Sequence, residues 1–85
     1  MDKRRRAQLK GAAQQIEATV HVGKDGVTDD VVAEVAKQLK AKRLVKVRLL
    51  PSIEQDRHDA AEALASRASA VLVEVRGRTA VLAKE

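Results

Sequence analysis

The 85-residue chain has no cysteine, no Phe, Trp or Tyr, and a single proline. Without cysteine there is no disulfide framework, no thiolate metal site and no cysteine nucleophile. Without aromatic rings, RNA modules that stack bases on the face of a sheet are excluded, and only arginine planes and aliphatic surfaces remain for stacking. The core must therefore be built from Val, Leu, Ala and Ile, and contact with a nucleic acid would involve chiefly its backbone.

Long apolar runs are also absent. No apolar stretch approaches the roughly 20 residues that a membrane span requires, and the basic N-terminus is not followed by the apolar segment of a signal peptide. The sequence is therefore expected to be soluble and cytoplasmic, with no membrane partner. A chain of 85 residues is short enough for one domain, which we expect to cover residues 1–85 and to act as a monomer.

Positive charge is what the chain has in excess, because its formal net charge is +5 and its pI is near 10. In so short a chain this balance favours a polyanionic partner such as nucleic acid, or an anionic membrane surface. The usual signatures of catalysis are missing, namely paired carboxylates, a Ser-His-Asp set, a metal-ligand cluster and a Walker-type lysine motif. We therefore expect no enzymatic activity and no cofactor.

The segment from Ala18 to Leu39 predicts a short strand, a glycine-bounded loop and a helix. Val20 and Val22 alternate with polar residues, which is the period of a strand with one buried face. After the loop Gly23-Lys24-Asp25-Gly26, Thr28 is expected to cap a helix whose apolar residues recur at helical spacing. KH-type modules clamp single-stranded RNA backbone with a GxxG loop in this position, and a helix N-terminus suits an anion. A tight turn without a ligand is the alternative.

A basic cluster, Lys3 to Arg6, leads into a first predicted helix, and Lys10 extends its charge by one turn. The helix is predicted by an apolar stripe at i, i+3, i+4 and i+7, formed by Leu9, Ala12, Ala13 and Ile16. The alternative for the cluster is a solvated, frayed terminus. Its position beside a helix favours a functional role, while Gly11 indicates either close packing or a shorter helix.

A second strand is expected from Leu44 to Leu50, with the valines on one face and Lys46 and Arg48 on the other. Like charges on one sheet face repel each other and are not needed for folding. Together with the preceding Lys42 and Arg43, they predict a basic strip with a functional role.

Ser52 is expected to cap a third helix that runs to about Ser69. Its predicted inner face consists of Arg57, Ala60, Ala61, Leu64 and Ala68. His58, between Glu54 and Glu62, is interpreted as an exposed residue that pairs at i,i+4 spacing. Two final strands, residues 71–75 and 79–83, should form a hairpin at Gly77 with the basic tip residue Arg78.

The predicted order is therefore helix, strand, helix, strand, helix, strand, strand. Each strand–helix–strand unit predicts a parallel crossover, and the terminal hairpin adds an antiparallel pair. The predicted fold class is α/β, a compact two-layer α-β sandwich with a mixed four-stranded sheet and helices chiefly on one face.

These motifs resemble those of the CRM domain (chloroplast RNA splicing and ribosome maturation) in its single-domain, YhbY-like form. The resemblance covers nearly the whole chain. Its motifs are Leu9-Lys10-Gly11, Gly23 and Gly26 followed by Val27-Thr28, Leu44-Val45-Lys46-Val47, and Gly77-Arg78-Thr79. It implies a fold similar to the C-terminal domain of translation initiation factor three. It also implies binding of structured RNA, on a large-subunit ribosomal RNA precursor or pre-ribosomal particle.

The sequence departs from the family pattern at two places. Family members often carry an aromatic residue near the end of the last strand, where this chain has only aliphatic residues. The glycine loop is also locally acidic, because Asp25, Asp29 and Asp30 outnumber Lys24. We therefore expect RNA contacts to be distributed over Arg4, Arg5, Arg6, Lys10, Gly23, Lys24, Asp25, Gly26, Lys46, Arg48 and Arg78. An architectural duplex-DNA-binding protein and a structural ribosomal protein are the alternatives.

Overall fold

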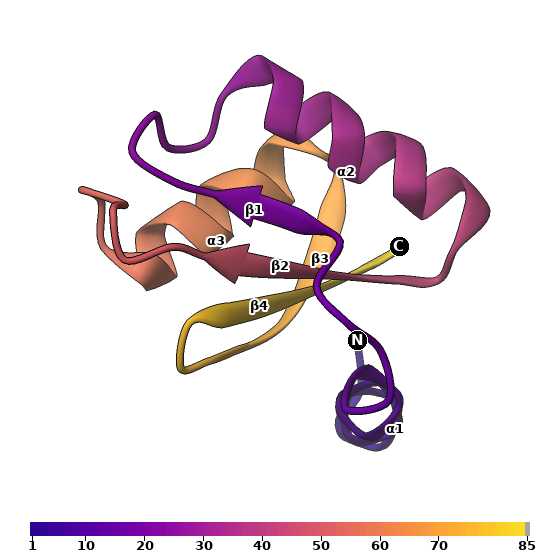
Figure 1. Cartoon of the computed structure of the whole chain (residues 1–85). Coiled ribbons are helices and arrows are strands. Elements are labelled where there is room, and N and C mark those ends of the chain that lie inside the picture. The colour runs from indigo at the N-terminus through magenta and orange to yellow at the C-terminus, as the bar shows by residue number, and fades with distance from the viewer. Residues whose placement is uncertain (85) are drawn as a thin grey trace.

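The helices and strands follow each other in the predicted order (Figure 1). The computed structural model describes residues 1–84, and Glu85 lies outside the described residues. The elements are α1 (Lys3–Ala13), β1 (Val20–Val22), α2 (Asp29–Ala41), β2 (Leu44–Leu49), α3 (Arg57–Arg67), β3 (Ala70–Arg76) and β4 (Thr79–Lys84).

The four strands form one mixed sheet in the order β1-β2-β4-β3. β1 pairs in parallel with β2, so that Val20 lies opposite Val47 and His21 opposite Arg48. β4 runs antiparallel to β2 on one side and to β3 on the other. β2 and β3 therefore run in the same direction, with β4 between them. The α/β class and the mixed sheet predicted from the sequence are confirmed.

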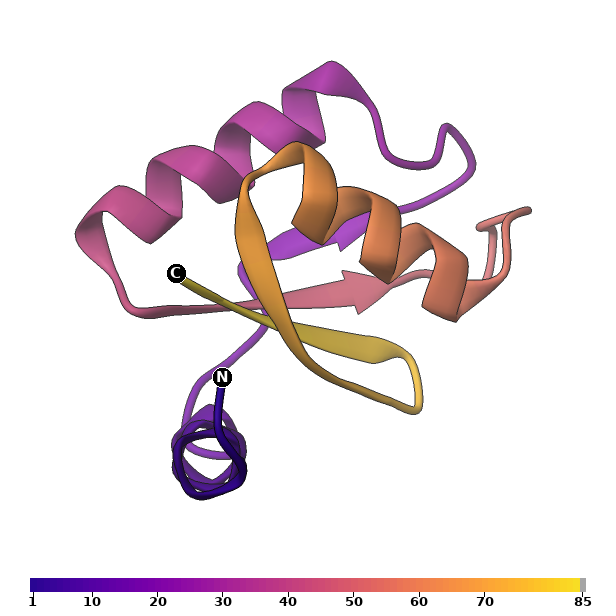
Figure 2. The same cartoon turned by 180° about the vertical axis from the view of Figure 1, so that it is seen from behind.

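The main core lies between one face of the sheet and the helices α2 and α3 (Figure 2). Alternate residues of β1 and β2 point into it because a strand presents successive side chains to opposite faces. The buried members of this core are Val20, Val22, Val35, Leu39, Val45, Val47, Leu49, Ala61, Leu64, Ala65, Ala80 and Leu82. As the composition required, every one is aliphatic.

Helix α1 lies against the opposite face of the sheet and adds a partial third layer (Figure 1). Leu9 and Ala13 pack there on a second cluster that Val73, Val81 and Ala83 contribute from β3 and β4. This helix therefore covers the β3–β4 half of that face. The other half stays open, and His21 of β1 and Arg48 of β2 are exposed on it.

The first helix ends at Ala13, earlier than its apolar stripe predicted. Ala12 is exposed and Ile16, beyond the helix, is 37% exposed, so only two of the four stripe residues are buried. A Cβ on Gly11 would have no neighbour within 4 Å. Of the two readings of this glycine, close packing within the described chain is wrong and the shorter helix is confirmed.

The predicted cap of α3 is wrong, because Asp56 caps this helix in place of Ser52. The Asp56 carboxylate accepts hydrogen bonds from the backbone N–H groups of His58 at 2.9 Å and Asp59 at 3.1 Å. Ser52 instead lies in a turn that the Ile53 N–H closes on the Leu50 carbonyl. The first N–H groups of a helix have no partner within it, and a carboxylate can accept hydrogen bonds from two of them. The cap therefore lies four residues after the predicted Ser52.

Residue Arg57 does not belong to the inner face of α3. It is exposed, and its guanidinium donates to the Gly77 carbonyl at 3.1 Å, which ties the start of α3 to the β3–β4 hairpin. The other four predicted residues face the core, because Ala60, Ala61 and Leu64 are buried and Ala68 packs against the main cluster. His58 is exposed, as expected.

Thr28 caps α2 as predicted, since its hydroxyl oxygen accepts the Val31 N–H at 3.2 Å. Thr28→Ala should therefore lower the free energy of unfolding by about 1 kcal/mol, because the Val31 N–H at the start of the helix would lose its hydrogen-bond acceptor. Thr28→Ser keeps the acceptor and is the matched control. Denaturant unfolding measures both, and an alanine variant as stable as the parent would show that α2 does not depend on this cap.

Within residues 1–84, no helix combines the length and the apolar character that crossing a bilayer requires.

Candidate nucleic-acid interface

The glycine loop, residues 23–26, is a tight turn between β1 and α2, closed by a hydrogen bond from the Gly26 N–H to the Gly23 carbonyl at 2.9 Å. Gly26 has a φ of +72°, in the left-handed region that side chains with a Cβ rarely adopt. Gly23 packs closely, because a Cβ there would lie 3.2 Å from the Ser52 Oγ and 3.4 Å from the Leu50 Cδ1. Both glycines therefore have a structural reason within the chain, and a ligand is not needed to explain them.

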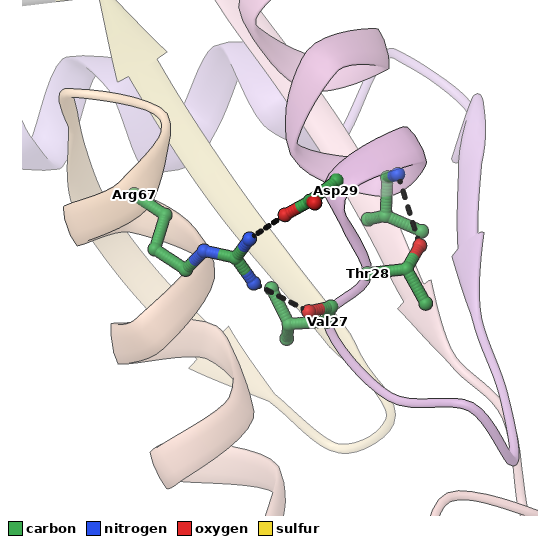
Figure 3. A network of polar contacts seen from close by, with 5 residues as sticks. Val27, Thr28, Asp29 and Arg67 are labelled. Carbon is green, nitrogen blue, oxygen red and sulfur yellow. Dashed lines mark hydrogen bonds and ion pairs between the residues drawn. The ribbon is translucent and has the colours of Figure 1, made fainter.

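Arg67, at the end of α3, holds the segment that joins this loop to α2 (Figure 3). Its guanidinium donates to the Val27 carbonyl at 2.6 Å and pairs with the Asp29 carboxylate. The ion pair is exposed and contributes little stability by itself. The pair does change the charge near the loop. Asp29 is one of the three acids expected to repel an anion there, and Arg67 of α3 now compensates its negative charge.

The open half of the sheet face lies beside the glycine loop. His21 is opposite Arg48, and Arg48 is opposite Thr79 on the next strand, so these side chains share one face. The β1–α2 loop and the β3–β4 hairpin lie at the same end of the sheet (Figure 1). Arg78 is tied to this end, because its carbonyl accepts the Leu49 N–H at 2.6 Å. The structure thus brings the loop, Arg48 and Arg78 to one end of the sheet.

Two of the basic residues predicted for this interface make contacts within the protein. The Arg6 guanidinium donates to the carbonyls of Leu72 at 3.1 Å and Val73 at 2.6 Å, which anchors α1 to β3. The Lys46 ammonium lies 3.4 Å from the Ala13 carbonyl and 3.5 Å from the Ile16 carbonyl, where it neutralises the C-terminus of α1. Both side chains are half-buried, and their first role is structural.

The basic residues of α1 do not all join the loop. Arg5 lies beside the C-terminus of α2, whereas the glycine loop precedes the N-terminus of the same helix. The 13 residues of α2 separate these ends by about 20 Å at 1.5 Å per residue. Arg4 is exposed and Lys10 half-buried on α1, and Lys24 and Asp25 are exposed at the loop. Among the predicted contact residues, Arg5 therefore lies at the C-terminal end of α2, whereas the glycine loop lies at its N-terminal end.

A group of cations surrounds Arg5. We call this group the basic groove, and it consists of Arg5, Lys40, Lys42, Arg43 and Lys84. Two of them, Lys42 and Arg43, belong to the basic strip predicted from the sequence, whereas Lys40 and Lys84 were given no binding role. Arg43 and Lys84 become neighbours because Leu44 pairs with Ala83 and the Lys84 N–H donates to the Arg43 carbonyl at 3.0 Å. From the sequence, Lys40 looks like an ordinary cation at a helix C-terminus. Lys84 joins the groove only because β4 pairs antiparallel with β2.

Comparison with known proteins supplies relatives for the whole fold. The family model described as the CRS1 / YhbY (CRM) domain matches residues 1–84. The chain is 39% identical to "Probable RNA-binding protein YqeI" of Bacillus subtilis over 77 residues, which cover 91% of this chain and 80% of that protein. It is 36% identical over 76 residues to "Probable RNA-binding protein MJ0652" of Methanocaldococcus jannaschii, of whose length the match covers 56%.

A solved structure has the same fold. It is the solution structure of the hypothetical protein SAV1595 from Staphylococcus aureus, with a TM-score of 0.85 and 25% sequence identity. The match covers 100% of this chain and 88% of the other. The order and packing of the elements described above are therefore found in a protein with a quite different sequence.

Proposed function

Because the chain belongs to the CRS1/YhbY (CRM) domain family, we propose that it binds structured RNA as a monomeric, cytoplasmic single domain. Two relatives named as probable RNA-binding proteins support the class of partner. The observation that carries the proposal is the end of the sheet where Arg48 and Arg78 lie exposed beside the glycine loop. Neither arginine has an ion-pair partner among residues 1–84, so both can reach phosphate.

The physical basis of binding would be contact with the RNA backbone. The interface has no aromatic ring on which a base could stack, but it offers guanidinium groups and the N-terminus of α2. Contacts of this kind position a nucleic acid without reading its sequence. Specificity would then come from the shape of a folded RNA, which is how proteins recognise RNA helices.

Competition between a structured RNA and duplex DNA of equal length, at one salt concentration, tests the class of nucleic acid. Salt dependence alone cannot separate them, because both release counterions. We expect the RNA to displace duplex DNA. Preferential retention of the DNA would support an architectural DNA-binding protein instead.

We further propose that the target is a large-subunit ribosomal RNA precursor and that the protein is an assembly or processing factor. Fractionation of ribosomes tests this step. We expect the protein on precursor particles and not in stoichiometric amounts on mature ribosomes. Equal amounts on mature ribosomes would favour a structural ribosomal protein.

The salt dependence of RNA binding follows from the number of cations that face outward. If about five phosphates are neutralised, the logarithm of the association constant should fall against the logarithm of salt concentration with a slope on the order of −3 to −4. Six of the predicted basic residues remain for this purpose once Arg6 and Lys46 are assigned to internal contacts. Filter binding or fluorescence anisotropy over a range of salt measures the slope, and a slope near zero would contradict the electrostatic account.

A further inference from the structure

The basic groove lies at the end of α2 that is farthest from the glycine loop. Three elements and one connection form it, because Arg5 belongs to α1, Lys40 to α2, Lys42 and Arg43 to the α2–β2 connection, and Lys84 to β4. The cavity has a volume of about 360 Å³, and Leu39 and Ala41 complete its lining. Within the part of the chain that the structure describes, no acidic residue lines it.

The cationic groups of the groove make no hydrogen bond or ion pair with the part of the chain that the structure describes. Other cations of the same chain behave differently, because Arg6, Arg57 and Arg67 each donate to a main-chain carbonyl. The groove cations are therefore available to a ligand.

Electrostatics argues that this arrangement is completed by an anion. Cations gathered in a groove raise the local positive potential, which attracts anions and steers them to the site. The C-terminus of α2 compensates only about half a unit charge, which one cation satisfies. The remaining positive charge favours an anionic ligand at this surface.

We propose that the basic groove is a second phosphate-binding subsite, which holds the RNA backbone about 20 Å from the glycine loop. This inference rests on the proposed RNA-binding function and locates a second point of contact. A strand of stacked nucleotides advances roughly 3.4 Å per nucleotide, so the two ends of α2 are separated by about six nucleotides. An RNA longer than this can occupy both ends at once, and the second contact then forms at a high effective concentration.

A charge-matched pair of double variants tests the groove. Lys42→Gln with Arg43→Gln removes two groove cations, and Lys37→Gln with Arg76→Gln removes one lysine and one arginine that are exposed outside it. For a folded RNA of about twelve nucleotides or more, we expect the groove variant to lose about tenfold in affinity. Its salt slope should become shallower by about 1.5, since each lost phosphate contact removes roughly 0.7 to 0.9. The control should stay within about threefold of the parent, because it loses only long-range attraction.

Amide chemical shifts of the parent protein give a second measurement that needs no variant. On addition of the same RNA, resonances of Lys42, Arg43 and Lys84 should move together with those of the glycine loop. Equal affinity losses in the two double variants, or unchanged groove resonances while the RNA binds elsewhere, would overturn the subsite and leave the proposed function standing. Failure of the parent protein to bind any RNA would overturn both.

Discussion

Gly26→Asp should weaken RNA binding by about thirtyfold, while Gly26→Asn should stay within about threefold of the parent. The two side chains have the same shape, and both tolerate positive φ better than other residues that carry a Cβ. Space is also available, because a Cβ on Gly26 would meet only the Gln55 Oε1, at 3.7 Å. The pair therefore differs in charge alone. An added carboxylate beside Asp25 would repel phosphate from the N-terminus of α2 by about 2 kcal/mol, which is about thirtyfold.

Gly26→Ala completes this experiment, because it adds a small side chain without charge. Alanine at a φ of +72° should cost roughly 1 kcal/mol of stability, so thermal unfolding must be measured alongside binding. If the asparagine and alanine variants are folded and both bind weakly, close approach of the RNA backbone is the cause. Unchanged RNA affinity of a folded Gly26→Asp protein would make residues 23–26 a structural turn only, and the site would move to the open sheet face and the basic groove.

Arg6→Ala should lower the free energy of unfolding by about 2 kcal/mol, whereas Arg4→Ala should leave it within about 0.5 kcal/mol. The neighbouring arginines have the same chemistry and different surroundings. Arg6 is half-buried and donates to two carbonyls of β3, while Arg4 is exposed. Hydrogen bonds to a charged group contribute roughly 1.5 to 3 kcal/mol, and their loss leaves carbonyls of β3 without this donor.

Measuring stability and RNA affinity together on the Arg6 variants separates a structural role of Arg6 from a role in RNA binding. For a domain of this size, a loss of 2 kcal/mol corresponds to a fall in melting temperature of roughly 10 °C, which calorimetry detects easily. Arg6→Lys keeps the charge, but an ammonium group lacks the planar guanidinium that donates to the carbonyls of Leu72 and Val73. This variant should therefore be less stable and should retain its RNA affinity at low temperature. A stable Arg6→Ala protein with strongly reduced RNA affinity would contradict the anchoring role and return Arg6 to the RNA-contact residues.

Local sequence signals determined most of the elements of this fold. The alternation around Val20 and Val45 and the helical spacing after Thr28 depend only on neighbours in the chain, and these features are confirmed. The order of the elements then predicts the parallel crossover and the terminal hairpin. The cap of α3 was predicted wrongly because Ser52 and Asp56 are both acceptable caps, and the turn that closes at Ile53 selects between them.

The division of the basic residues between internal and external roles was decided by tertiary structure. In the sequence Arg4 and Arg6 are equivalent, and so are Lys46 and Arg48. Arg6 and Lys46 become structural because α1 crosses the sheet face and brings carbonyls of β3 and of its own C-terminus within their reach. The basic groove arises in the same way, since residues 5, 40–43 and 84 meet only after the antiparallel pairing of β2 and β4 and the docking of α1. The sequence by itself determined the total charge and the secondary structure, because both depend on residue type and local spacing. Which charges face a ligand depends on contacts between distant segments, and these exist only in the folded chain.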